Sequence, residues 1–314
     1  MEPISITGLG SYLPRLMHTN QSLPPLDQPL SPEEYDRIGV YRRGWAGEGE
    51  GIAEMGAAAA RVALERAGLE ADALDFIILA NWTQRRYIPE FAPKLKRLLG
   101  AKRAFAYDVC CACAGFIYGL SMGQGFLRDP RFSRGLVVAS ETTSQRGRPG
   151  SKATVILGDA AGAFVLERGE RGATGRLLDW ELNTDGDAHD IMDVSPEGWV
   201  RTRITQKELN GLAGRSFGHT IHALLARNRL TLDDVKWVVP HSGTAGVQAM
   251  VQKTLEVSPD KVLTNYAEIG NVSSASIPAA LDHFIGKGII QPGDLVISAA
   301  VGTGWYSAGM LYRI

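Results

Sequence analysis

The three cysteines of the chain are its most reactive side chains, and they lie within four positions as Cys110, Cys111 and Cys113. Neighbouring cysteines cannot form a disulfide without strain, and a secreted framework would spread an even number of them along the chain. A metal site would need a fourth ligand and a second cluster with recognisable spacing, and none of the six histidines lies near in sequence. Two alternatives remain: one nucleophile, or three small buried cysteines.

Cys113 lies where an extended segment meets a predicted helix, in the sequence DVCCACAGFIYGLSMGQGFL. The free amides and the dipole at a helix N-terminus stabilise a thiolate, which makes such a cysteine a candidate nucleophile near pH 7. The small residues beside it would let an acyl thioester approach the backbone. Cys110 and Cys111 precede the turn and point to opposite faces of a strand, so we expect structural roles for both.

Three more positions could serve this chemistry. His241 ends the strand-like segment WVVPHSGT, and Asn271 lies at a strand-to-helix turn in EIGNVSSASIPAALDHF. The segment VGTGW, residues 301–305, is a glycine-rich turn suited to presenting backbone amides to an oxyanion. Taken singly, His241 could equally be a structural histidine and Asn271 a helix cap.

The elements that must position these residues alternate along the chain. Ala-rich amphipathic segments at 52–68 and 215–229 have apolar residues at helical spacing. Short β-branched runs between them predict buried strands. These runs are FIILA (76–80), LVVAS (136–140), AFVLE (163–167), WVVP (237–240), LVISAA (295–300) and AGMLY (308–312). The alternation predicts an α/β fold built in layers.

An internal repeat organises these elements. RAGLEADALDFIIL (66–79) aligns with RNRLTLDDVKWVVP (227–240), and its Arg, first Leu and aromatic recur 161 positions later. Leu136 and Leu295, in two similar strands, lie 159 positions apart. We therefore expect two similar halves, residues 1–170 with the cysteine and residues 171–314 with the histidine and asparagine. Their interface would bring Cys113, His241 and Asn271 together.

One segment departs from the pattern. Residues 183–211, NTDGDAHDIMDVSPEGWVRTRITQKELNG, are polar and lack clear periodicity. They are expected to form a surface excursion.

Composition excludes several classes of protein. The 314 residues are 45% hydrophobic, with 33 basic and 34 acidic side chains and a formal net charge of −1. This balance argues against nucleic acid or an acidic lipid surface as a partner, and no run approaches the roughly 18 apolar residues of a membrane span. The N-terminus has no basic region or cleavage site, so we expect a soluble, cytoplasmic protein.

The chain resembles the β-ketoacyl-acyl-carrier-protein synthase III family of the thiolase superfamily along essentially its whole length. The segments that carry the resemblance are DVCCACAGFIYGL, ILGDAAGAFVL, VPHSGT, GNVSSASIPAALD and PGDLVISAAVGTGWYSAGMLYRI. The resemblance implies the five-layer αβαβα thiolase fold, made of two pseudo-repeated halves, and a homodimer. It also implies a transferase of fatty acid or secondary metabolite biosynthesis.

The resemblance assigns roles to the residues that match. Cys113 is the acylated nucleophile, and His241 and Asn271 bind the thioester carbonyl of the extender and stabilise the enolate formed on decarboxylation. The amides of Cys113 and Thr303 form the oxyanion hole. The implied reaction loads an acyl group from acyl-CoA onto Cys113 and condenses it with a malonyl thioester. No permanently bound cofactor and no metal is implied.

Departures from the family affect the expected partners. The family histidine is usually followed by Gln-Ala-Asn and soon by an arginine, whereas this chain has Ser-Gly-Thr at 242–244 and Gly246. Whether an acyl carrier protein docks is therefore left open. The coenzyme A contacts implied by the resemblance are an aromatic side chain, the arginine that follows it, and one of two further arginines. These candidates are Tyr35, Arg37, Arg146 and Arg148.

The family lines its acyl pocket, partly across the dimer interface, with the segment that corresponds to NWTQRRYIPE (81–90). The candidates here are Arg85, Arg86 and Ile88. Arginines beside a buried pocket require an anion, which would favour an acyl chain ending in a carboxylate. The alternative is a salt-bridged surface loop.

Two other functions stay open at this stage. Because the loop after His241 is altered, an acyltransferase could pass the acyl group from Cys113 to an alcohol or amine. A thiolase-fold chain could also serve as a non-catalytic partner subunit, because a fold does not by itself imply an activity.

Overall fold

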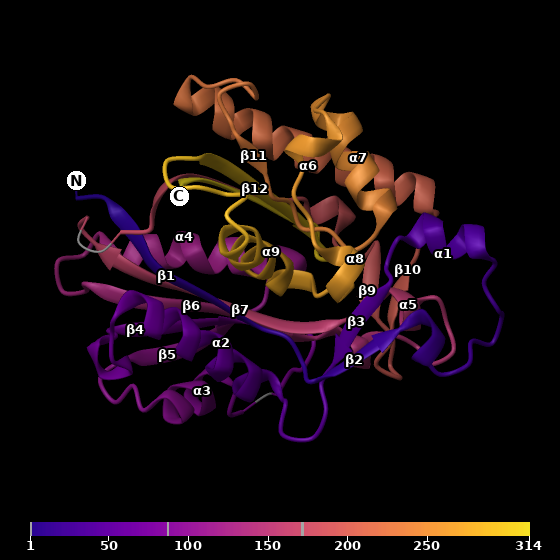
Figure 1. Ribbon diagram of the computed structural model, residues 1–314, viewed down its shortest axis with the longest axis horizontal. Coiled ribbons are helices and arrows are strands. Elements are labelled where there is room, and N and C mark those ends of the chain that lie inside the picture. Colours follow the sequence, from indigo (N-terminus) through magenta and orange to yellow (C-terminus); the bar gives the residue numbers. More distant parts are fainter. Residues whose placement is uncertain (1, 87, 171–172) are drawn as a thin grey trace.

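Nine strands form one strongly bent mixed sheet in the computed structural model, which describes residues 2–86, 88–170 and 173–314 (Figure 1). The strand order is β11-β12-β13-β8-β1-β7-β6-β4-β5. The bounds are β1 (Ile4–Tyr12), β4 (Phe76–Ala80), β5 (Phe105–Val109), β6 (Arg134–Thr142), β7 (Asp159–Arg168), β8 (Gly175–Thr184), β11 (Trp237–Val238), β12 (Leu295–Gly302) and β13 (Tyr306–Arg313). Two antiparallel pairs stand apart: β2 (Leu16–Thr19) with β3 (Arg42–Trp45), and β9 (Met192–Val194) with β10 (Val200–Thr202).

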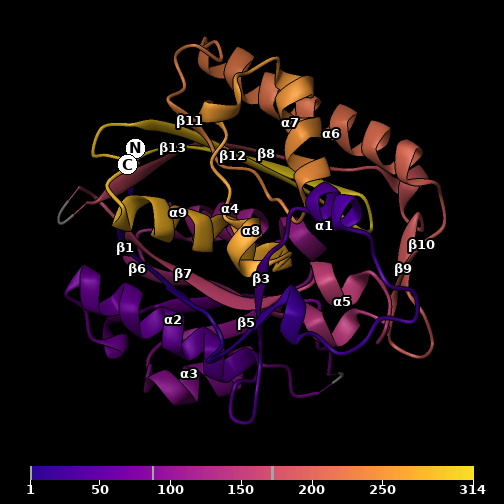
Figure 2. The ribbon, with the colours of Figure 1, turned by 45° about the vertical axis from the view of Figure 1, so that its right-hand side comes forward.

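The helices complete five layers. Their bounds are α1 (Pro32–Ile38), α2 (Ile52–Ala67), α3 (Ala92–Leu99), α4 (Gly115–Leu127), α5 (Ala153–Ile156), α6 (Gln206–Asn228), α7 (Ala245–Leu255), α8 (Tyr266–Ile269) and α9 (Ser276–Gly286). Figures 1 and 2 show α4 and α9 between the two parts of the sheet, with α2 and α3 outside one part and α6 and α7 outside the other. The predicted αβαβα fold is therefore confirmed.

The two parts of the sheet are joined at a narrow seam. There β1 pairs with β8 through only three residues, Ile4 to Ile6. The pairings run in the same order on both sides of the seam. On one side, β1, β7 and β6 are antiparallel neighbours and β4 lies parallel to β6. On the other side, β8, β13 and β12 are antiparallel neighbours and β11 lies parallel to β12. The division into residues 1–170 and 171–314 itself stays a prediction.

Small residues allow the layers to pack closely. The Ala-rich face of α2 lies directly on β1, where a Cβ at Gly10 would come within 2.5 Å of the Ala59 carbonyl oxygen. The buried side of α2 consists mainly of alanines, and burial of this apolar surface stabilises the layer by about 25 cal/mol per Å². The six predicted strand runs are confirmed, although β11 is shorter than the predicted 237–240.

The segment 183–211, for which the sequence predicts a surface excursion without clear periodicity, is mostly exposed or partly exposed but contains regular elements. It contains the β9–β10 pair, and α6 begins within it at Gln206, nine residues before the predicted start. Thr205 caps α6 by accepting from the Glu208 amide, while Glu208 accepts in return from the Thr205 amide. A periodicity analysis does not detect this structure, because the strands are only three residues long and the capping residues are polar.

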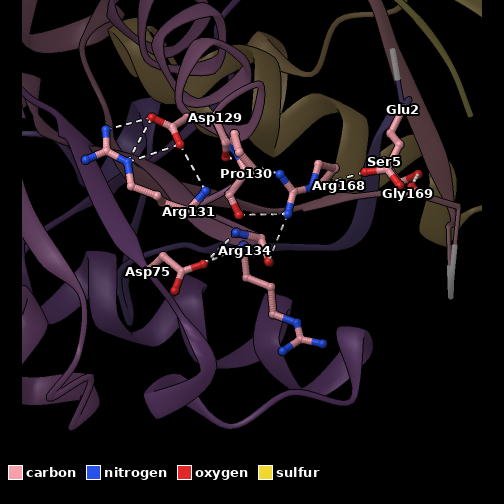
Figure 3. A network of polar contacts seen from close by, with 10 residues as sticks. Glu2, Ser5, Asp75, Asp129, Pro130, Arg131, Arg134, Arg168 and Gly169 are labelled. Carbon is pink, nitrogen blue, oxygen red and sulfur yellow. Dashed lines mark hydrogen bonds and ion pairs between the residues drawn. The ribbon is translucent and has the colours of Figure 1, made fainter.

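The end of the sheet near the C-terminus of α4 is held by a polar network (Figure 3). Arg131 pairs with Asp129, and Arg168 donates to the carbonyls of Asp129 and Pro130. The Asp75 carboxylate accepts from the backbone amides of residues 133 and 134. The rise of 1.5 Å per residue puts this network about 20 Å from the N-terminal end of α4, so it supports the scaffold rather than the candidate site.

Candidate active site

Cys113 lies in the turn between β5 and α4, as predicted. Ala112 adopts a left-handed conformation with φ of 45°, and a 3-10 turn over Ala112–Ala114 leads directly into α4. This sharp turn exposes the Cys113 side chain to a cavity of about 240 Å³. Of the neighbouring cysteines, Cys111 is buried and Cys110 is exposed.

The protonation of Cys113 differs from the expectation. Burial raises the pKa of its thiol to about 11, with the nearby Glu141 carboxylate acting in the same direction. A hydrogen bond from Ser273 and the backbone amide of Cys113 itself lower this pKa and offset only part of the rise. The expected thiolate near pH 7 at the helix N-terminus is therefore corrected, because desolvation outweighs the favourable helix end.

His241 follows β11 and lines the same cavity. Its amide donates to the Ala299 carbonyl of β12 at 2.8 Å, which fixes the backbone. Its Nδ1 lies 2.8 Å from the Ser276 hydroxyl, so Nε2 is the nitrogen left for the cavity. Burial lowers the pKa of His241 to about 4, and the imidazole is accordingly neutral at pH 7.

The tautomer of His241 is coupled to the orientation of the Ser276 hydroxyl. This hydroxyl lies 2.7 Å from the Ser273 carbonyl as well as 2.8 Å from Nδ1, and a hydroxyl has one hydrogen to donate. When the Ser276 hydroxyl donates to the Ser273 carbonyl, Nδ1–H of His241 donates to the Ser276 oxygen and Nε2 is an acceptor. When the hydroxyl instead donates to Nδ1, Nε2 carries the imidazole proton and is a donor.

Asn271 also reaches the cavity, from the turn before α9. Its backbone amide donates to Ile156 at 2.7 Å, and its Oδ1 accepts from the Ser273 amide at 2.9 Å. Because Oδ1 is held in this way, the Nδ2 donor is the group left for a ligand. Gly243 lies directly against this side chain, since a Cβ there would be 2.5 Å from Nδ2.

The glycine-rich turn after β12 closes the site. Thr303 lines the cavity, and the preceding Gly302 lies so close to Cys113 that a Cβ would be 2.7 Å from the Cys113 amide nitrogen. Cys113, His241, Asn271 and Thr303 therefore share one cavity, as the sequence predicts. Within the described residues, no group of three or more His, Cys, Asp or Glu side chains is placed to hold a metal ion.

Sequence reasoning singled out no role for several residues that line this cavity. One is Ser273, two positions after Asn271, and another is Trp82, which follows β4 and belongs to the predicted acyl-pocket segment 81–90. The β9–β10 pair contributes Met192 and Val200, and α6 contributes Phe217, so most of the wall is apolar. In the sequence, only the alternation of Met192 and Val194 around a charged residue indicates the β9–β10 hairpin.

The four candidate coenzyme A residues do not line this cavity. Tyr35 and Arg37 lie on α1, and Arg148 pairs with Asp27 at 2.7 Å. Arg146 donates to the carbonyls of Thr83 and Gly198, an arrangement that ties loops together. Their role as nucleotide contacts stays a prediction.

The three candidate acyl-pocket residues do not line the cavity of their own chain, and their role in a pocket formed partly across the dimer interface stays a prediction. Arg85 pairs with Glu90 at 2.7 Å, and the Arg86 guanidinium lies 5.0 Å from the centre of the Phe91 ring. Ile88 is 91% exposed. The ion pair of Arg85 supports the alternative of a salt-bridged surface loop for this residue. Tyr87, in the same segment, lies outside the described residues.

The fold and the cavity define a thiolase-fold protein that brings a cysteine, a histidine and an asparagine together. Residues 107–186 match the family model described as 3-oxoacyl-[acyl-carrier-protein] synthase III, and residues 225–314 match its C-terminal model. The β-ketoacyl-[acyl-carrier-protein] synthase III of Dinoroseobacter shibae is 36% identical over 310 residues, 95% of each chain. This chain belongs to the β-ketoacyl-acyl-carrier-protein synthase III family.

Solved structures agree with this placement. The 3-oxoacyl-[acyl-carrier-protein] synthase III of Aquifex aeolicus superposes with a TM-score of 0.92 at 32% identity, covering 99% of this chain and 100% of the other. The priming β-ketosynthase of the R1128 polyketide pathway superposes with a TM-score of 0.90 at 25% identity, covering 100% and 96%. Among the described helices, none has the length and apolar character needed to cross a membrane.

Proposed function

We propose that this chain is a condensing enzyme that takes an acyl group from acyl-CoA and joins it to a malonyl thioester. The observation that carries the proposal is the convergence of Cys113, His241 and Asn271 on one largely apolar cavity. The family relationship supports the same reaction, because the relatives are named β-ketoacyl-[acyl-carrier-protein] synthases.

In the loading step, the Cys113 sulfur bonds to the acyl carbonyl carbon and the bond from that carbon to the coenzyme A sulfur breaks. The Cys113 proton passes through Nε2 of neutral His241, or directly, to the departing coenzyme A thiolate, which leaves as the thiol. The amides of Cys113 and Thr303 would bind the oxyanion of the tetrahedral intermediate. The close approach of Gly302 to Cys113 supports this pairing of amides.

In the condensation step, the malonyl carboxylate leaves as CO2 and its electron pair forms the enolate of the remaining thioester. Asn271 Nδ2 and the Nε2–H tautomer of His241 would donate to the enolate oxygen. The enolate carbon then bonds to the acyl carbonyl carbon, the bond from that carbon to the Cys113 sulfur breaks, and the sulfur leaves as a thiolate that takes up a proton from solvent. Two neutral donors in an apolar cavity stabilise developing negative charge without reorganisation, which is where such donors are most effective.

The finer assignments of partners are proposals of the same kind. We assign nucleotide binding to the region of Tyr35, Arg37, Arg146 and Arg148, and the second substrate to a malonyl group on acyl carrier protein. The apolar wall with Met192, Val200 and Phe217 favours an alkyl acyl chain over one ending in a carboxylate. Comparing butyryl-CoA with glutaryl-CoA as acyl donors tests this, and faster loading by glutaryl-CoA would contradict it.

We also propose that the enzyme is a homodimer joined at β5. This strand ends the order of the described sheet, and its free edge carries Phe105, which is 39% exposed. Met122 of α4 is 36% exposed, and an aromatic cluster around Phe126 and Phe132 surrounds the edge. An apolar edge strand of this kind requires a cover. Analytical ultracentrifugation should give a dimer that Phe105→Lys weakens, whereas a wild-type monomer would contradict the proposal.

The product distinguishes the proposed function from its alternatives. With butyryl-CoA and a malonyl thioester, condensation releases CO2 and extends the acyl chain by two carbons. An acyltransferase would leave the chain length unchanged and release no CO2. A non-catalytic subunit would give neither a product nor an acyl adduct, which intact-protein mass reveals.

A further inference from the structure

Ser273 makes three contacts that connect the candidate catalytic groups. Its hydroxyl donates to the Cys113 sulfur at 3.3 Å, its amide donates to Asn271 Oδ1 at 2.9 Å, and its carbonyl accepts from the Ser276 hydroxyl that contacts His241. The residue is buried and has a φ of 52°, a strained conformation for any residue but glycine. Strain of this kind persists only where surrounding contacts fix it, and here those contacts lead to the reacting atoms.

Trp82 fixes the direction of the bond to sulfur. Its indole Nε1 lies 2.6 Å from the Ser273 hydroxyl oxygen. An indole N–H can only donate, so the serine oxygen must accept from it. The single hydroxyl hydrogen of Ser273 is therefore free to donate to the Cys113 sulfur, and a thiolate can only accept such a bond.

Glu141 holds Trp82 and Ser273 in place relative to each other. One carboxylate oxygen accepts from the Ser274 hydroxyl at 2.5 Å. The other accepts from the backbone amides of Trp82 and Thr83 and from the Thr83 hydroxyl, at 3.3, 3.2 and 2.8 Å. A single buried side chain at the end of β6 therefore joins the loop that carries Trp82 to the turn that carries Ser273.

We propose that Ser273 is a further catalytic residue, which donates a hydrogen bond to the Cys113 sulfur as it becomes a thiolate, and that Trp82 is the positioning residue that aims this hydroxyl. The proposal rests on the proposed role of Cys113 as nucleophile. The sulfur is otherwise desolvated, and a donor already aimed at it lowers the free energy of the charged form without reorganisation.

The pH dependence of alkylation measures this directly, because iodoacetamide reacts with the thiolate and requires neither substrate. In the described part of the chain, the Glu141 carboxylate of β6 raises the pKa of Cys113 and His241, after β11, lines the same cavity, and every variant retains both. Fragment-ion mapping must distinguish Cys113 from the exposed Cys110. Ser273→Ala should lower the rate at Cys113 at pH 7 by roughly ten- to a hundredfold and move its pH profile to higher pH.

Alanine is a suitable replacement, because Ala112 already occupies the corresponding left-handed position before α4. Trp82→Phe removes the N–H and keeps an aromatic ring, and it should shift the profile in the same direction by about threefold to tenfold. In a Ser273→Ala background, Trp82→Phe should add nothing, since the indole acts through the serine.

A second serine–tryptophan contact provides a matched control at the same cavity, which Trp305 also lines. Ser216 accepts a hydrogen bond from Trp305 Nε1 at 2.9 Å, the same type of contact without a sulfur. Ser216→Ala should retain the wild-type alkylation profile. The proposal is overturned if Ser273→Ala matches the Ser216→Ala profile, or if Trp82→Phe has its full effect without Ser273. Should Ser273→Ala fail to fold, an unchanged profile in Trp82→Phe overturns the positioning role. Failure of condensation with these shifts intact would instead refute the proposed function alone.

Discussion

The turns before α4 and α9 have nearly the same backbone and very different side chains. Each begins with a left-handed residue, Ala112 with φ of 45° and Ser273 with φ of 52°, followed by a 3-10 turn and a helix in the central layer. In the first turn the next residue is Cys113, whose sulfur faces the cavity. In the second the next residue is Ser274, whose hydroxyl donates to buried Glu141.

This difference shows how one type of turn can provide both the nucleophile and the hydrogen-bond donors of an active site. The first turn supplies a nucleophile and its amide, while the second supplies only donors, from Asn271 and Ser273. Because α4 and α9 begin in the same layer, both turns open on one cavity. The fold provides the positions, and the local side chains decide which turn reacts and which one stabilises charge.

The largest effect should follow from removing the sulfur of the first turn. Cys113→Ala should abolish the acyl adduct and reduce condensation by at least about 10³-fold, because no other group there can form the thioester. Intact-protein mass and product formation measure the two effects. Cys110→Ala is the control. A larger loss of condensation in Cys110→Ala than in Cys113→Ala would show that Cys113 is not the nucleophile.

Removing the donor of the second turn should separate the two steps of the reaction. Asn271→Asp keeps the oxygen that accepts from the Ser273 amide but replaces the Nδ2 donor. CO2 release should fall by about 10²- to 10³-fold, while loading of Cys113 by acyl-CoA continues. If loading fell as far as CO2 release, Asn271 would belong to the first step as well.

A smaller effect should come from crowding the same asparagine. Gly243→Ala places a Cβ where only 2.5 Å separates it from Asn271 Nδ2, so the amide must move. We expect about a tenfold loss of condensation with loading unchanged, on the scale that small misplacements cost. Gly246→Ala is the matched control, since its nearest neighbour would be 3.7 Å away. Equal rates in the two variants would show that the position of Asn271 tolerates this displacement.

The smallest effect concerns the anchor of the second turn. Burial raises the pKa of Glu141 to about 7 from an ordinary 4.5, so between these pH values the folded protein keeps a proton that the unfolded chain releases. Stability therefore falls as pH rises through this window. The melting temperature should drop between pH 5 and pH 8 by roughly 5 °C more in wild type than in Glu141→Gln. Asp159, whose pKa is raised to about 6, is present in both proteins. If the melting temperatures of the two proteins changed equally with pH, the raised pKa of Glu141 would be contradicted.

Much of the scaffold could be predicted because it depends on local patterns. Buried strands such as β4 and β6 are continuous apolar runs, and the motifs around Cys113, His241 and Asn271 identify the family. The β9–β10 pair and the start of α6 could not be predicted in this way, since their stabilising contacts are caps and ion pairs such as Arg201 with Asp193.

The contacts that tune the site were hidden for a different reason. Trp82 and Ser273 are 191 positions apart, and neither residue type indicates a hydrogen bond across the cavity. The pKa of Cys113 depends on burial by every layer around it, whereas the sequence shows only the helix that follows. Arg85 pairs with Glu90 and the Arg86 guanidinium lies over the Phe91 ring, and these contacts near in sequence could not be assigned without the loop conformation.

The site of acylation tests the central claim most directly. Wild-type enzyme mixed with butyryl-CoA, digested and analysed by fragment-ion mass spectrometry should carry one butyryl group on Cys113. Addition of a malonyl thioester should then remove that group and release one CO2 for each acyl group transferred. An adduct on Cys110 or Cys111, or an adduct on Cys113 that a malonyl thioester leaves in place, would contradict the account.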